Sequence, residues 1–354
     1  MRKIKYFQAI KEAQEQLLQK DKSVIIMGLG VNDPKGIFGT TKNLYKKFGN
    51  KRVLETPTSE NAVTGVAIGA AIQGLKPILT HQRVEFSLLS IEQIINQAAK
   101  WNFMSAGEFK IPLVIRLIIG KGWGQGPQHS QSLEVLFSHI PGLKVVVPSS
   151  AYDAKGLLVS SVKDSSPVIF FEHRWLHNID GIVPKKIYSI KIGKAKILQR
   201  GKDITIVSFS EALIQVLRLK KILKACGISA EIIDLRSLRP LDKNCILKSV
   251  KKTKKLLVVD NSWKSYGISA EIVSVVAENL SNLKEKPIRL GIKEIPIPSS
   301  RALAKECYLN SDIILREISK LTKIKIIEKV KKKYLKQLSL TETDVPYKDF
   351  QGPF

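Results

Sequence analysis

The chain has few cysteines and no long apolar run, and both absences narrow its class. Its three cysteines, Cys226, Cys245 and Cys307, are scattered and form no Cys-x-x-Cys pair. This argues against a disulfide framework or a zinc site and favours reduced thiols. No apolar stretch reaches the roughly 18 residues that a membrane span needs, and the first ten residues lack the apolar core of a secretory signal. We therefore predict a cytoplasmic protein without a membrane partner.

Acidic residues are scarce relative to basic ones. The chain has 31 Asp and Glu against 58 Lys and Arg, a net charge of +27. Such an excess can indicate a nucleic-acid partner. Here the lysines are spread along the chain, only residues 320–336 form a basic block, and no zinc-finger, RRM or interleaved aromatic-basic pattern is present. A Lys- and Ile-rich genome gives the same excess, so we predict no specific binding of nucleic acid.

Short apolar runs alternate with segments of helical periodicity along a chain of 354 residues, long enough for two domains. We expect strands at 23–27, 76–80, 111–117, 144–148, 167–172, 203–209, 230–234, 255–260 and 287–290, and helices at 6–19, 62–72, 90–101, 152–162, 211–226 and 269–279. This alternation indicates mostly parallel sheets that are covered on both faces. We predict two three-layer α/β domains, 1–180 and 203–325, a linker at 181–202, and a basic, extended tail at 326–354.

Glu60 opens a segment of small residues and is the first candidate catalytic residue. Residues 62–72 are almost all Ala, Gly, Val and Ile, so the helix should pack closely and shield a carboxylate at its start from water. A shielded carboxyl group holds its proton more readily, as a group that exchanges protons near neutrality must. The alternative is a carboxylate that only caps the helix or interacts with its dipole.

Several short motifs stand in a fixed order between about residues 5 and 324. They include Gly36-Ile-Phe-Gly-Thr-Thr-Lys, Thr56-Pro-Thr-Ser-Glu60, Gly65-Val-Ala-Ile-Gly-Ala-Ala71, Ile94-Ile-Asn-Gln-Ala-Ala-Lys100, Gln128-His-Ser-Gln131, Asp234-Leu-Arg-Ser-Leu-Arg-Pro240 and Tyr266-Gly-Ile-Ser-Ala-Glu271. In this order and spacing they resemble the beta subunits of the thiamine-diphosphate-dependent 2-oxo acid dehydrogenases, which are relatives of transketolase. The resemblance covers the pyruvate, branched-chain and acetoin types. It implies an oxidoreductase component with a transketolase-like fold.

The resemblance also implies roles for three residues. In the family, the Glu of the Thr-Pro-x-Ser-Glu motif, here Glu60, contacts the N1′ nitrogen of the cofactor's aminopyrimidine. A proton shared there favours the imino form of the ring, whose exocyclic nitrogen can then remove the thiazolium proton. Phe86 falls where the family stacks an aromatic ring on the pyrimidine; the alternative is a core Phe. His129 follows a glycine-rich loop, where the family's His handles substrate and the acyl group; the alternative is a loop His bonded to backbone.

A missing motif implies a partner. The family's cofactor enzymes hold diphosphate and a divalent metal through a Gly-Asp-Gly segment, and this chain has none. The resemblance therefore implies half an active site, with thiamine diphosphate bound across an interface and Mg²⁺ held by an alpha-type subunit, in an α2β2 assembly. We expect no metal ligands in this chain. A lipoyl acyltransferase would be a further partner.

One segment departs from the pyruvate-type pattern. Between Pro77 and Phe86 the chain reads Ile-Leu-Thr-His-Gln-Arg-Val-Glu, where that pattern is more apolar or aromatic. His81 and Arg83, together with Glu85, would make the substrate pocket more polar. We therefore expect a substrate other than pyruvate.

Three functions remain open from the sequence. The first is a beta subunit that decarboxylates a 2-oxo acid and passes the acyl group to a lipoyl carrier. The second is a transketolase-like half enzyme that moves a two-carbon or acyl unit to a sugar or aldehyde in biosynthesis. The third is a non-catalytic assembly subunit, against which the presence of Glu60, Phe86 and His129 argues.

Overall fold

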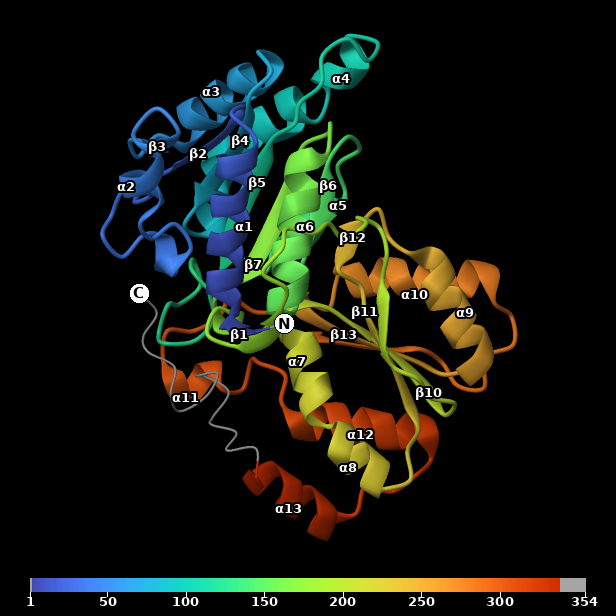
Figure 1. Cartoon of the computed structure of the whole chain (residues 1–354). Helices are drawn as coiled ribbons and strands as arrows, with labels where there is room; N and C mark the ends of the chain where they lie inside the picture. Colours follow the sequence, from blue (N-terminus) through green and yellow to red (C-terminus); the bar gives the residue numbers. More distant parts are fainter. Residues whose placement is uncertain (1, 338–354) are drawn as a thin grey trace.

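The computed structural model describes residues 2–337 and is built on two large β-sheets, each with helices on both faces (Figure 1). Within these residues a short third sheet pairs β1 (Arg2–Lys5) antiparallel with β8 (Asp180–Val183). Two three-layer α/β units with mostly parallel sheets are the fold class predicted from the sequence, which is confirmed.

The first sheet carries the loops that matter for function. Its strand order is β12-β6-β7-β5-β4-β2-β3, and all neighbours are parallel except β12 and β6. The strands are β2 (Val24–Gly28), β3 (Val53–Glu55), β4 (Lys76–His81), β5 (Val114–Ile119), β6 (Lys144–Val146), β7 (Val168–His173) and β12 (Ser237–Arg239). β2, β5 and β7 are buried along their whole length, as strands covered on both faces must be.

Alternate residues of these strands face two different helix layers. Ile26 and Ile78 pack with α1 (Tyr6–Lys20) and α6 (Ala151–Lys163). Ile25 and Leu79 pack with α3 (Glu60–Ile72) and α5 (Glu134–Ser138) on the other face. The period of two along each strand therefore divides one apolar run between two cores. Two short helices, α2 (Leu44–Phe48) and α4 (Trp101–Met104), lie outside these layers.

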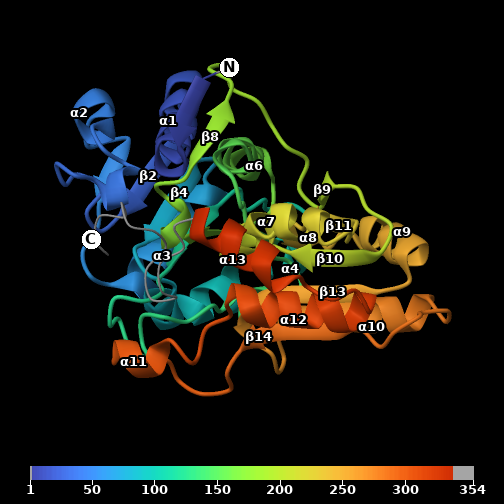
Figure 2. The same cartoon turned by 90° about the horizontal axis from the view of Figure 1, so that it is seen from below.

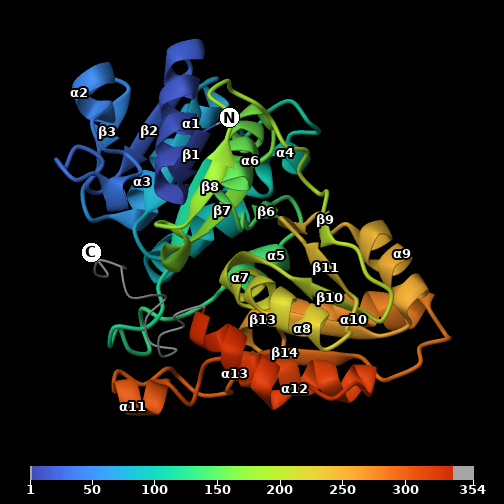
Figure 3. The same cartoon turned by 60° about the horizontal axis from the view of Figure 1, so that its bottom comes forward.

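The second sheet has the order β14-β13-β10-β11-β9 and is parallel except for β9. Its strands are β9 (Lys196–Gln199), β10 (Ile204–Ser208), β11 (Ala230–Asp234), β13 (Leu256–Trp263) and β14 (Ile288–Ile292). One face is covered by α7 (Ser210–Arg218), α8 (Lys220–Ala225) and α12 (Ser311–Thr322), and the other by α9 (Lys243–Thr253) and α10 (Ile268–Asn279). Figures 2 and 3 show the helices of this half arranged on either side of its strands.

The two halves are interlocked. β12 comes from the second half of the chain but pairs with β6, at the edge of the first sheet. The short helix α11 (Arg301–Ala304) follows β14 and lies apart from the helices that cover the second sheet (Figure 1). The predicted domain boundaries remain predictions, because shared elements of this kind leave no clean cut between the halves.

The local structure differs from the expectation in four segments. The helix expected at 211–226 is two helices, α7 and α8, separated at Leu219. The one expected at 90–101 is a 3₁₀ segment, Val84–Ser90, followed by a π-helical turn, Gln93–Ala98. The expected linker contains β9 and most of β8, because both pair with other strands. The expected extended tail begins with helix α13 (Glu328–Gln337), which packs on the second half; residues 340–354 lie outside the described part.

Candidate functional site

A pocket lies where the loops after β2, β3 and β4 meet. These parallel strands end at the same edge of the sheet, and β2 lies between β3 and β4. The strand that follows β2 in the chain, β3, lies on one side of it, and the next strand, β4, lies on the other. Where the strand order reverses in this way, a crevice forms at the carboxyl ends of the strands. The crevice has a volume of about 290 Å³ and is lined by Leu29, Thr56, Pro57, Thr58, Glu60, Val63, Leu79, Thr80, His81, Gln82, Phe86 and Leu89.

Glu60 is the first residue of α3 and reaches this pocket from the helix start. The shielding from water that the sequence predicts is absent in this chain, because Glu60 is only half-buried and Ser59, Asn61 and Ala62 are exposed. The close packing of α3 is one-sided. Its inner face contacts the sheet, but Val66 on the outer face is 62% exposed. Among the described residues the Glu60 carboxylate has no hydrogen-bond partner, so it is available to a ligand.

Phe86 lines the same pocket and is 36% exposed. Its ring meets the ring of His129 edge-on, with centroids 5.7 Å apart and an interplanar angle of 78°. A half-exposed ring in an apolar pocket is available for stacking against a flat ligand. The core Phe expected as the alternative would be buried, and this one is not.

His81 also lines the pocket, but it does not bring a charge to it. Its side chain is buried, and its Nε2 lies 3.4 Å from the Thr64 hydroxyl. Burial lowers the pKa of His81 to about 4, so the ring is neutral at pH 7. Its contribution to the pocket is therefore a neutral hydrogen-bonding group.

Arg83 is separated from His81 although only one residue lies between them. Arg83 is 7% exposed and does not line the pocket of Glu60. Its guanidinium carbon lies 5.5 Å from the centre of the Phe38 ring, and burial lowers its pKa. The structure thus divides the two residues predicted for the substrate: His81 lies with Glu60 and Phe86, and Arg83 lies nearer His129.

His129 is delivered by the loop after β5, and the second half of the chain holds the start of that loop. The Lys121 ammonium lies 3.0 Å from a carboxylate oxygen of Glu211. The backbone oxygen of Lys121 accepts a hydrogen bond from Trp175 Nε1 at 2.7 Å, and Gly122 N–H donates to the Tyr308 hydroxyl at 3.3 Å. The second half therefore helps to position this loop, besides any role in assembly.

The protonation of His129 follows from its surroundings. Burial, and then the positive charge of Arg83, lower its pKa. Its Nδ1 is buried without a hydrogen-bond partner among the described residues. A neutral His with one free ring nitrogen beside the pocket of Glu60 is suited to accept or donate a proton.

The Gly28-Leu-Gly30 turn after β2 is already occupied by a carboxylate of the chain. The backbone N–H groups of Gly30 and Asn32 donate to Glu55 at 2.5 and 3.1 Å. A turn whose N–H groups hold a carboxylate does not offer them to a phosphate. Within residues 2–337 no group of three or more His, Cys, Asp or Glu is placed to hold a metal ion.

Comparison with known proteins identifies the family. The pyrimidine-binding domain of transketolase matches residues 2–178, and the transketolase C-terminal domain matches residues 193–314. A pyruvate dehydrogenase E1 component subunit beta from Porphyra purpurea is 40% identical over 316 residues, which cover 89% of this chain and 96% of the relative. The chain belongs to the family of the pyruvate dehydrogenase E1 beta subunits.

Two further relatives widen the picture of this family. The beta subunit of an acetoin:2,6-dichlorophenolindophenol oxidoreductase from Cupriavidus necator is 41% identical over 325 residues, 88% of this chain and 94% of the relative. A solved structure described as a split gene transketolase, inactive beta4 tetramer, has a TM-score of 0.74 at 20% identity and covers 91% of this chain and 99% of its own. It shows the fold alone. The family, the enzyme class and the transketolase-like fold predicted from the sequence are confirmed.

Membership of this family agrees with the elements that carry the pocket. Glu60, Phe86 and His129 all lie in the half of the chain that matches the pyrimidine-binding domain. Gln125 and Ser130, which lie beside them, were missed from the sequence because a glycine-rich loop gives no signal of which side chains turn inward. No helix in residues 2–337 is both long and apolar enough to span a membrane. The cytoplasmic location remains a prediction.

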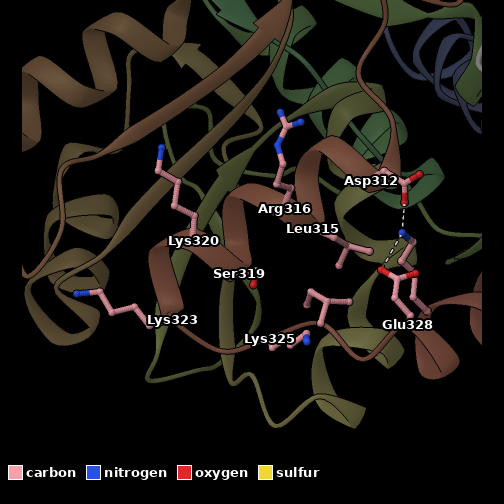
Figure 4. Close-up of a pocket in the computed structure, with 10 residues that line it drawn as sticks. Asp312, Leu315, Arg316, Ser319, Lys320, Lys323, Lys325 and Glu328 are labelled. Atoms are coloured by element: carbon pink, nitrogen blue, oxygen red, sulfur yellow. Dashed lines mark hydrogen bonds and ion pairs between the residues drawn. The ribbon is translucent and has the colours of Figure 1, made fainter.

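A second, more open groove lies between α12 and α13, on the second half of the chain (Figure 4). Its volume is about 570 Å³, and its lining includes Arg316, Lys320, Lys323 and Lys325. Part of its charge is neutralised, because Lys331 lies 2.8 Å from Asp312 and 3.3 Å from Glu328. None of the residues around Glu60 belongs to it.

We expect this basic groove, and the rest of the surface, to bind duplex DNA only weakly. Scattered lysines bind phosphates without reading sequence, and release of counterions makes such binding fall steeply with salt. A filter-binding titration at low and at physiological salt measures this, with a scrambled duplex as the control. Sequence-selective binding that persists at physiological salt would show that the charge is functional.

Proposed function

We propose that this chain is the pyrimidine-binding half of a thiamine-diphosphate-dependent enzyme that decarboxylates a 2-oxo acid and passes the acyl group to a lipoyl carrier. An alpha-type subunit would hold the diphosphate and Mg²⁺, in an α2β2 assembly. The observation that carries the proposal is the placing of Glu60 and Phe86 in one pocket at the switch point of the first sheet.

The pocket fits an aminopyrimidine ring. Val63, Leu79 and Leu89 give it apolar walls, Phe86 gives it an aromatic surface, and Glu60 is its carboxylate. A flat heteroaromatic ring has apolar faces and a nitrogen edge, and this lining matches both. When bound, thiamine diphosphate supplies the electron sink for decarboxylation.

The residues of the chain then have separate tasks. Glu60 would hold or give up a proton at the N1′ nitrogen of a bound ring. Phe86 would offer its ring face to the bound pyrimidine and help to orient it. His129, neutral and edge-on to Phe86, is placed to move a proton to or from the substrate. His81, uncharged, hydrogen-bonds at the pocket floor.

An uncovered apolar surface at the pocket mouth supports the need for a partner. Leu89 lines the pocket and is 67% exposed, and the neighbouring Leu88 is 39% exposed. Val66 adds the outer face of α3. Apolar surface gathered around a site indicates an interface, and a subunit seated there would supply the shielding of Glu60 that this chain lacks.

A transketolase-like transfer to a sugar or aldehyde is the second candidate function. It is favoured by the polar side chains of Arg83, Glu85 and Gln125 near His129, which suit a hydroxylated molecule better than an apolar acyl group. The two candidates differ in acceptor. A lipoyl domain accepts the acyl group in the first case, and an aldehyde of a sugar accepts it in the second.

Cofactor affinity tests the proposed half-site. The full chain alone should bind thiamine diphosphate weakly, and the chain co-expressed with an alpha-type subunit should bind it tightly in the presence of Mg²⁺. Isothermal calorimetry on both samples, with and without Mg²⁺, gives the comparison. Tight Mg²⁺-dependent binding by the chain alone would refute the half-site.

Two variants locate the partner surface. Val66→Glu places a charge on the outer face of α3 and should prevent association with the alpha-type subunit, because desolvating an unpaired charge in an interface is costly. Ile182→Glu is the matched control, since Ile182 is 63% exposed on β8, which packs near α6 on the opposite face of the sheet from α3. Size-exclusion chromatography with light scattering reads the result. Equal association of both variants would place the interface elsewhere.

A further inference from the structure

Several buried polar atoms near His129 have no hydrogen-bond partner within the described residues. Buried polar groups are almost always paired, so such atoms indicate an absent ligand or water. The atoms are Arg83 Nη1, Glu85 Oε2, Gln125 Oε1 and Nε2, His129 Nδ1 and Ser130 Oγ. Arg83 and Ser130 are 7% and 5% exposed, so neither side chain can turn to bulk solvent.

The side chains of Gln125 and Arg83 and the backbone oxygen of His129 lie around Gly120, which follows the end of β5. A side chain at Gly120 would collide with Gln125 and with the backbone oxygen of His129, and its first carbon would lie 3.0 Å from Arg83 Nη1. Glu85 is joined to the same loop, because its Oε1 accepts a hydrogen bond from Gln131 N–H at 3.1 Å. Arg83 and Gln125 therefore meet at Gly120, and Glu85, His129 and Ser130 belong to this loop or are bonded to it; we call these five residues the Gly120 cluster.

The Gly120 cluster adjoins the pocket of Glu60 through two aromatic side chains. His129 belongs to the cluster, and its ring contacts Phe86, which lines the pocket. A substrate that reacts beside a ring bound in this pocket would thus reach the cluster with the part of its chain that extends past Phe86. No residue of the cluster other than His129 has a task in the first candidate function.

The mixture of donors and acceptors restricts what the cluster can bind. Arg83 Nη1 and Gln125 Nε2 only donate, Glu85 Oε2 accepts when ionised, and the Ser130 hydroxyl does both. The methyl group of pyruvate would leave all of them unpaired. A second carboxylate would pair with Arg83, but Glu85, whose pKa burial raises to about 7, is ionised in part at neutral pH and would then repel it. Hydroxyl groups donate and accept at once and satisfy both kinds of atom.

We propose that Arg83, Glu85 and Gln125 form a specificity subsite for a substrate whose carbon chain carries two or more hydroxyl groups, such as a sugar-derived 2-oxo acid. This inference rests on the proposed function, since it places the substrate beside a cofactor whose pyrimidine ring occupies the pocket of Glu60. It excludes His81 from the subsite. It also gives Glu85 and Gln125 a specific role, whereas the sequence predicted only a more polar substrate pocket.

Two 2-oxo acids of equal chain length test the subsite, namely 3-deoxy-2-oxogluconate and 2-oxohexanoate, which differ only in hydroxyl groups. Trp123 lies in the loop of the cluster, so tryptophan fluorescence of the chain with its co-expressed alpha-type subunit reports binding. The hydroxylated acid should bind at least about tenfold more tightly, the effect of one hydrogen bond to a charged group. A site built for hydroxyl groups rejects the analogue that lacks them.

Substitutions in the Gly120 cluster test whether its residues cause the preference for the hydroxylated acid. Arg83→Met and Glu85→Gln should each reduce the preference for the hydroxylated acid by about tenfold or more and leave the affinity for 2-oxohexanoate nearly unchanged. Gln125→Ala, at a half-buried loop position, repeats the test if a change at buried Arg83 prevents folding. Arg200→Met and Glu108→Gln, at exposed positions, are the matched controls and should change neither affinity.

Three results would overturn the subsite: equal affinity for the two acids, no binding of either, or a preference that persists in all the cluster variants. Equal affinity would mean that water alone satisfies these atoms. Failure of the proposed function is read separately, as loss of thiazolium-proton exchange in the unmodified assembly. Normal exchange with equal affinities would remove the subsite and leave the cofactor role intact.

Discussion

Glu60→Gln should slow exchange of the thiazolium proton of bound thiamine diphosphate by about 10²- to 10⁴-fold, the range lost with a general acid–base group. Gln is nearly isosteric with Glu, so the fold and the subunit assembly should survive. The amide cannot share a proton with N1′ of the pyrimidine as a carboxyl group does. Exchange into deuterated water, followed by NMR in the assembled complex, requires no knowledge of the substrate.

The control is Glu108→Gln, which removes a carboxylate from an exposed loop and should leave exchange unchanged. Cofactor affinity should be measured on both variants, so that a slow exchange is not mistaken for an empty site. If Glu60→Gln assembles, binds cofactor and exchanges at the unmodified rate, Glu60 interacts only with the dipole of α3. The proposed mechanism would then fail.

Much of the fold was predictable because burial on both faces leaves a clear sequence pattern. Val24 to Gly28 is an apolar run of strand length, and Val114 to Ile119 is apolar except for Arg116; both are fully buried strands of the first sheet. Glu60 and Phe86 meet in one pocket because β3 and β4 are parallel strands on either side of β2. The sequence alone did not show this strand order. In contrast, the shielding of Glu60 was predicted wrongly, because α3 packs closely only on its inner face and leaves the residues around Glu60 exposed.

Where the local structure differs from the prediction, the causes are local and do not appear in the hydrophobic periodicity of the sequence. The 3₁₀ segment before the expected helix buries Val84, Ser87 and Ser90 at a spacing of three, and the π-helical turn after it buries Ile94 and Ala98. Leu219 is buried where α7 gives way to α8, so the break leaves the hydrophobic pattern intact. The Gly120 cluster depends on side chains from separate segments, which no single stretch of sequence shows.

Arg116 and Glu172 form a fully buried ion pair between β5 and β7, the source of the second large expected effect. Arg116 Nε donates to Glu172 Oε1 at 2.5 Å and Nη2 donates to Oε2 at 3.0 Å, with both side chains 0% exposed. Further bonds from Arg116 reach Thr40 at 2.9 Å, and His177 Nε2 lies 3.2 Å from Glu172. The charge of Glu172 thus has partners on two sides.

Arg116→Met should lower the free energy of unfolding at pH 7 by about 3–5 kcal/mol, because it leaves the Glu172 carboxylate buried without its cation. Urea unfolding followed by circular dichroism measures the change. Lys144→Met is the matched control, since it breaks a partly exposed pair with Asp164 and should cost only about 0–1 kcal/mol. Equal effects of the two variants would contradict the importance of the buried pair.

The same pair predicts how this loss depends on pH. Burial alone would raise the pKa of Glu172, but the charge and hydrogen bonds of Arg116, with His177 Nε2 3.2 Å away, hold it at about 2, below its ordinary value of 4.5. A lowered folded-state pKa stabilises the protein above the unfolded value, and this stabilisation is lost as pH falls toward about 2. Without Arg116, burial dominates and the carboxyl protonates more readily. The difference in stability between the unmodified protein and Arg116→Met should therefore begin to shrink above pH 4.5, where the buried carboxyl of the variant takes up a proton, and continue to shrink toward about pH 2. A difference independent of pH would assign the loss to packing alone.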